Sequence, residues 1–102
     1  MSKVMGKAPS MALYETILQL KDLDECFRFF QDLCTISELR AMEQRFDVAV
    51  LLEKGMIYND ILDKTGASSA TISRVNRSLN YGVDGYKDVF GRLAITEQPD
   101  EK

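Results

Sequence analysis

The chain of 102 residues contains no histidine and no tryptophan, and it has only two cysteines, Cys26 and Cys34. The usual zinc sites therefore lack ligands, and no serine has a histidine base that could activate it as a nucleophile. No glycine-rich phosphate loop is present either, so we expect that the protein is not an enzyme. The cysteines lie in an apolar, aromatic stretch, and we expect two reduced, buried thiols.

Long apolar runs, interior prolines and a general basic excess are also missing. No stretch approaches the roughly 18 apolar residues of a membrane span, and the N-terminus lacks a secretory core, so we expect a cytoplasmic protein without a membrane partner. The only prolines, Pro9 and Pro99, lie near the termini and leave the chain between them free to be helical. The net charge of −3 argues against a general polyanion binder. Of the four segments 1–34, 35–57, 58–93 and 94–102, only 58–93 is net positive, with five basic and four acidic side chains.

Apolar residues recur at helical spacing in nearly every segment, and no segment alternates as a strand would. The sequence therefore predicts an all-α fold of about six helices. We expect a flexible arm at 1–9, a single helical domain at 10–93 and a flexible acidic tail at 94–102. The first third is apolar on more than one side, which indicates burial against another subunit.

Residues with strong capping preferences mark the expected helix ends. Asp22 or Asp24 should cap the second helix, and Ser10 can cap the first. A capping box, Thr35-Ile-Ser-Glu38, predicts a long third helix with Leu39, Met42, Phe46, Ala49 and Val50 on its inner face. Gly55 should end that helix, and Asp84 should cap the last one.

The most informative stretch runs from Tyr58 to Asn80, where two short helices flank Gly66. A steep helix crossing needs a residue that accepts positive φ at the bend, and glycine does so without strain. Ser68 is a good N-cap for the second helix, and Ile61 and Ile72 can pin the two helices together. The stretch is therefore predicted to be a helix–turn–helix.

The outer N-terminal half of this second helix carries small and hydrogen-bonding residues that can approach base edges in the DNA major groove. We predict base or near-base contacts from Ser69, Ala70, Ser73 and Arg74. We predict phosphate or positioning contacts from Lys64, Ser68, Thr71 and Arg77. Serine-rich helix starts are also common as simple caps. A helical dimerisation or protein-interaction module without DNA binding therefore stays open as the alternative.

The segment Gly66-Ala-Ser-Ser-Ala-Thr-Ile-Ser-Arg74, with Asn76 and Ser78-Leu79 after it, resembles the recognition helix of the Trp repressor superfamily. Upstream, Thr35, Glu38, Arg40-Ala-Met42 and Arg45 resemble that family's central helix. The stretch Tyr81-Gly-Val-Asp-Gly-Tyr86 is most similar to the YerC/YecD-type TrpR-like proteins of Firmicutes. The resemblance covers about residues 12–93 and is specific over about 35–80.

The resemblance implies an intertwined homodimer that places one recognition helix in each half-site of a palindromic double-stranded DNA operator. It implies a transcriptional regulator, a repressor of amino-acid metabolism or transport genes, with a small amino acid as corepressor. By the motif match, the effector-binding positions are Thr35, Arg45, Arg74 and Ser78.

Tryptophan itself fits this implied effector site poorly. The position after Arg74 is glycine in the Trp repressor and Val75 here, and a branched side chain would intrude on a flat indole. A smaller amino acid such as histidine, or no ligand at all, both stay open.

Overall fold

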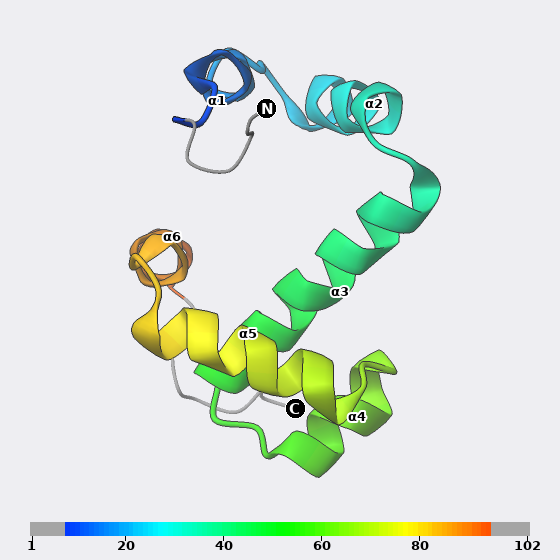
Figure 1. Ribbon diagram of the computed structural model, residues 1–102, viewed down its shortest axis with the longest axis vertical. Coiled ribbons are helices and arrows are strands. Elements are labelled where there is room, and N and C mark those ends of the chain that lie inside the picture. The colour runs from blue at the N-terminus through cyan, green and yellow to red at the C-terminus, as the bar shows by residue number, and fades with distance from the viewer. Residues whose placement is uncertain (1–7, 95–102) are drawn as a thin grey trace. The chain divides into compact units, whose positions relative to one another are not determined.

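The computed structural model describes residues 8–94, and within this range the chain consists of helices and the turns between them (Figure 1). The helices are α1 (Met11–Ile17), α2 (Leu23–Leu33), α3 (Ile36–Glu53), α4 (Tyr58–Thr65), α5 (Ser69–Tyr81) and α6 (Gly85–Leu93). The predicted all-α fold is confirmed. No helix in the described range is long and apolar enough to cross a membrane.

The chain divides into two compact units, the first ending at Ile36 and the second beginning at Ser37. The single domain expected over 10–93 stays a prediction. Of the expected arm at 1–9, only residues 8 and 9 fall within the described range, and of the expected tail at 94–102 only Ala94 does.

The first unit contains α1 and α2. Asp22 caps α2 as predicted, because its Oδ1 accepts the backbone N–H of Glu25 at 2.9 Å. The Glu25 side chain in turn accepts the backbone N–H of Lys21 at 2.8 Å, so two N–H groups at this helix start are satisfied. Ser10 precedes α1 without a side-chain capping bond, and α1 ends at Ile17.

No described residue of the first unit is buried, although the sequence predicted burial on two sides. Leu18 and Leu23 are more than four-fifths exposed, at 81% and 83%, and Phe27 is 52% exposed. Two helices of seven and eleven residues offer each other too little surface to enclose such side chains. This unit therefore presents apolar side chains that the single chain does not cover.

Helix α3 begins at Ile36, directly after Thr35, belongs to the second unit from Ser37 onward, and ends where the sequence predicts. Gly55 has φ 91°, and its N–H donates to the Leu52 carbonyl at 3.0 Å. The N–H of Met56 donates to the Leu51 carbonyl, also at 3.0 Å. This pair of bonds is the Schellman arrangement that closes a helix on a left-handed glycine.

The core of the second unit draws on α3, α4, α5 and α6, which Figure 1 shows gathered around the C-terminal half of α3. Its buried residues are Val48, Ala49, Ile61, Ala67, Ile72, Val75, Leu79 and Phe90. Phe90 of α6 is 1% exposed and contacts the Phe46 ring edge-on, with 6.0 Å between ring centroids. This core fixes the position of α5, on which the predicted site depends.

Two sequence expectations for this unit were wrong. Phe46 was expected on the inner face of α3 but is 42% exposed, whereas Val48, which was not predicted, is fully enclosed. Helices contact α3 from more than one direction, so one apolar stripe does not describe its buried surface. Asp84 occupies the N-cap position of α6 but has φ 68° and makes no side-chain capping bond.

Candidate nucleic-acid interface

The helix–turn–helix predicted between residues 58 and 80 corresponds to α4, a short turn and α5, and the two helices pack against each other. Gly66 ends α4 with φ 73°, the left-handed conformation that was expected of it. Ala67 is 2% exposed in the turn. Ser68 then caps α5, and its Oγ accepts the backbone N–H of Thr71 at 3.1 Å.

Burial on one face of α5 determines which residues project outward. Ile72, Val75 and Leu79 are all at most 5% exposed and pack in the core with Ile61 of α4. Their spacing of three and four residues places them on one stripe of the helix. Of the residues between them, Ser73, Arg74, Arg77 and Ser78 are exposed on the open side of the helix, and Asn76 is half-buried.

Most of the predicted DNA-contacting residues are exposed, Lys64 on α4 and the others at the start of α5 or along it. The exposed ones are Lys64, Ser68, Ser69, Ala70, Ser73, Arg74 and Arg77. Thr71 is half-buried, and its hydroxyl accepts a hydrogen bond from the Ser68 hydroxyl at 3.1 Å. Ser68 and Thr71 thus hold the helix start together, while small side chains at Ser69, Ala70 and Ser73 leave it sterically open.

The basic side chains of this surface lack carboxylate partners, as do those of Lys21, Arg45 and Arg92 elsewhere in residues 8–94. Within residues 8–94, Lys64, Arg74 and Arg77 form no ion pair. By contrast, Arg28 pairs with Asp24 at 2.9 Å and Arg40 pairs with Glu43 at 2.9 Å. Arg74 and Arg77 share α5 with the small hydroxyl residues Ser69 and Ser73, and unpaired positive charges of this kind can attract and orient phosphate groups.

The turn is also held by contacts that the sequence analysis missed, all of them made by Thr65. Its Oγ1 donates to the Ile61 carbonyl at 2.8 Å and accepts the N–H of Ala67 at 3.1 Å. Its carbonyl accepts the side-chain Nε2 of Gln44 from α3 at 3.2 Å. A threonine in a last helical turn often bonds the carbonyl four residues back, but no local signal indicates the Gln44 contact.

The four predicted effector positions are divided between the two units. Arg45, Arg74 and Ser78 are exposed in the second unit, and Arg74 and Ser78 are one turn apart on α5. Thr35 belongs to the first unit. Ser78 lines a hollow of about 460 Å³ together with Gly82, Val83, Gly85 and Tyr86.

Val75 does not share the surface of Arg74 and Ser78. Its side chain is 2% exposed and packed in the core of the second unit. No open space therefore adjoins this position in the structure.

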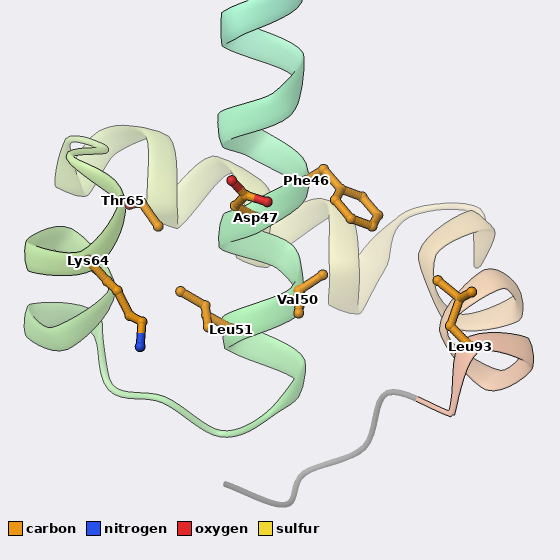
Figure 2. A pocket seen from close by; sticks show the side chains of 7 residues that line it. All are labelled: Phe46, Asp47, Val50, Leu51, Lys64, Thr65 and Leu93. Atoms are coloured by element: carbon orange, nitrogen blue, oxygen red, sulfur yellow. The ribbon is translucent and has the colours of Figure 1, made fainter. Parts of the chain in front are cut away.

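A second hollow, of about 480 Å³, lies beside α3 (Figure 2). It is lined by Phe46, Asp47, Val50 and Leu51 of α3, Lys64 and Thr65 of α4, and Leu93 of α6. Figure 2 shows the Lys64 amine lying apart from the Asp47 carboxylate, so the floor between them is mainly apolar. The sequence analysis did not anticipate this hollow.

Known proteins are similar to this chain over nearly all of its described residues. The family model of the Trp repressor protein matches residues 10–94. YerC of Bacillus subtilis (strain 168) is 52% identical over 95 residues, which cover 93% of this chain and 90% of YerC.

Solved structures are similar in both sequence and fold. A TrpR-like protein from Eubacterium eligens ATCC 27750 is 59% identical, with a TM-score of 0.81 over 84% of this chain and 89% of that one. A protein from Staphylococcus aureus is 44% identical, with a TM-score of 0.78 over 81% and 83% of the two chains. The chain therefore belongs to the Trp repressor protein family, a family of non-enzymatic DNA-binding regulators.

Proposed function

We propose that two copies of this chain bind a palindromic double-stranded DNA operator and repress genes of amino-acid metabolism or transport. The observation that carries this proposal is the open face of α5, where Arg74 and Arg77 have no acidic partner within residues 8–94 and small residues surround the helix start. Such a helix can enter the major groove with its N-terminal residues at the base edges. Family membership supports the same assignment.

Exposed apolar surface supports the dimeric part of the proposal. Leu18, Leu23 and Phe27 of the first unit and Phe46 and Leu93 of the second are at least 42% exposed. Apolar side chains in this number are costly to leave in water, and a second copy of the chain offers the same kind of surface in return.

The direct test is selection of bound sequences from random duplexes, followed by gel shift on the selected site. We expect a palindrome with half-sites about one helical turn apart. Arg74→Ala should weaken binding to this site by about 1–3 kcal/mol if Arg74 contacts a base, and sizing chromatography should show an unchanged dimer. Arg40→Ala is the matched control, because Arg40 is also exposed but already pairs with Glu43. Unchanged affinity in the Arg74 variant would contradict the assignment of α5.

A protein-interaction module without DNA binding is the alternative function, and the negative net charge favours it. The salt dependence of duplex binding separates the two. Specific DNA binding should weaken steeply as salt rises, because phosphate contacts release several counterions. An interaction module should show no duplex binding at any salt concentration.

The corepressor stays part of the proposal as a small amino acid held by Thr35, Arg45, Arg74 and Ser78. The hollow beside Ser78 has room for a small side chain. Because Val75 points into the core and does not line this hollow, it gives no structural argument for or against an indole ring. A thermal-shift panel of the standard amino acids tests this, since a ligand that binds only the folded state raises the melting temperature. A flat panel would favour a regulator without an effector.

A further inference from the structure

We infer that Gln44 positions the recognition helix on α3, and therefore sets the geometry in which α5 can meet DNA. This inference rests on the proposed function. Gln44 lies within α3 and donates its side-chain amide to the Thr65 carbonyl at 3.2 Å, across 21 residues of sequence. Thr65 is the last residue of α4, so the bond reaches the turn from which α5 starts.

The acceptor of this bond is a group that the helix itself leaves unsatisfied. The carbonyls of the last helical turn have no N–H partner within the helix. In α4 the Leu62 carbonyl accepts the N–H of Gly66, whereas the Thr65 carbonyl accepts the Gln44 amide. The contact is partly buried, where a hydrogen bond competes less with water than it does on an open surface.

The geometry of the bond complements that of the apolar core. Burial of Ile61 and Ala67 holds α4 and the turn against the unit, but hydrophobic contact is non-directional and tolerates small rotations. A hydrogen bond requires a narrow range of distance and angle. The hydroxyl of Thr65 also accepts the N–H of Ala67. A shift of the Thr65 backbone would therefore also shift Ala67, which directly precedes the N-cap of α5.

The consequence for DNA binding is greatest in a dimer. Two recognition helices must meet two half-sites at once, so a change in the angle of each helix changes the spacing that the pair can span. Without the Gln44 bond, the helix should occupy the competent orientation for only part of the time. Apparent affinity falls in proportion to that fraction.

The test replaces Gln44 with methionine, which keeps the length of the side chain and removes the donor. We expect roughly threefold to tenfold weaker binding to the selected operator, together with a broader dependence of affinity on half-site spacing. The second readout is decisive, because a merely destabilised protein would lose affinity equally at every spacing. Gln31→Met is the matched control, since Gln31 is an exposed glutamine on α2. Circular dichroism and urea unfolding check that each variant folds.

Gln44→Glu supplies a test of the donor itself. The ionised carboxylate would face the Thr65 carbonyl as a second acceptor, whereas the protonated acid can donate. Binding relative to the wild-type protein should therefore recover as the pH falls from about 7.5 toward about 5, approaching the ordinary glutamate pKa of about 4.3. Asp47 and Lys64, which line the hollow next to Thr65, are present in both proteins, and the ratio at each pH removes their effect.

The outcomes separate this inference from the function on which it rests. A wild-type chain that selects no duplex would overturn both. Wild-type binding with an unchanged affinity and spacing profile in Gln44→Met would overturn the positioning role alone. A pH-independent Gln44→Glu variant would do the same.

Discussion

At the scale of single residues, Thr65 makes three hydrogen bonds that hold the turn between α4 and α5. Its hydroxyl donates to the Ile61 carbonyl and accepts the Ala67 N–H, and its carbonyl accepts a hydrogen bond from the side-chain amide of Gln44. Ala67 is 2% exposed, so water cannot replace Thr65 at its N–H without opening the core. One side chain thus prevents a buried donor from being left without an acceptor.

Thr65→Val tests this role, because valine keeps the shape of threonine and removes the hydroxyl. We expect the free energy of unfolding to fall by about 1–3 kcal/mol, the cost of an unsatisfied buried donor. Urea unfolding followed by circular dichroism measures the change. Thr16→Val on α1, where the threonine is exposed, serves as control. Equal stability of the two variants would contradict the role of the Thr65 hydroxyl.

At the scale of helices and turns, Gly66 tests whether the bend between α4 and α5 depends on backbone conformation alone. Its φ is 73°, and a Cβ built on it would meet nothing within 4 Å. Gly66→Ala should therefore cost about 1–2 kcal/mol through the left-handed conformation, and Gly66→Asn less, since asparagine tolerates it.

A glycine in ordinary helical conformation provides a control of opposite sign. Gly91 lies inside α6, and a Cβ there would also meet nothing within 4 Å. Gly91→Ala should stabilise the protein by about 0.5–1 kcal/mol, because alanine loses less conformational freedom in a helix. Urea midpoints that shift in the same direction for both glycines would contradict this account of the bend.

Helix ends were the part of the fold best predicted from the sequence, because their signals are local. Asp22, Gly55, Gly66 and Ser68 each occupy the predicted position at a helix end. Asp84 misled because its left-handed backbone replaces the extended conformation from which an N-cap side chain normally bonds. The packing of Phe46 and Val48 depends on several helices at once, which no single period describes.

The candidate site was predicted in part. The outward face of α5 follows from helical periodicity, and its exposed residues agree with that expectation. Their contacts with DNA and with an effector stay predictions. The Gln44–Thr65 hydrogen bond was missed because it joins residues 21 positions apart, and no local sequence pattern indicates such a contact.

At the scale of the whole molecule, the first unit has no core of its own. Residues 8–36 include no buried side chain, while Leu18, Leu23 and Phe27 are more than half exposed. Burial of apolar area is the main source of folding stability, so we expect this unit to gain stability chiefly by contact with a second copy of the chain. The proposed dimer makes stability a function of protein concentration.

We therefore expect the urea midpoint to rise with protein concentration. For a folded dimer in equilibrium with unfolded chains, each tenfold increase in concentration should add about 1.4 kcal/mol. Unfolding curves over about a hundredfold range of concentration, followed by circular dichroism, measure this. A midpoint that does not move would contradict dimerisation coupled to folding.

Gly82 has a consequence for the mutations that the chain can accept. A Cβ at this position would clash with the backbone oxygen of Ser78, whereas one at Gly85, three residues later, would meet nothing within 4 Å. Every other amino acid carries a Cβ, so a library that randomises both codons should retain glycine at the first and admit many residues at the second. Two glycines only three residues apart should therefore differ sharply in the number of amino acids that can replace them.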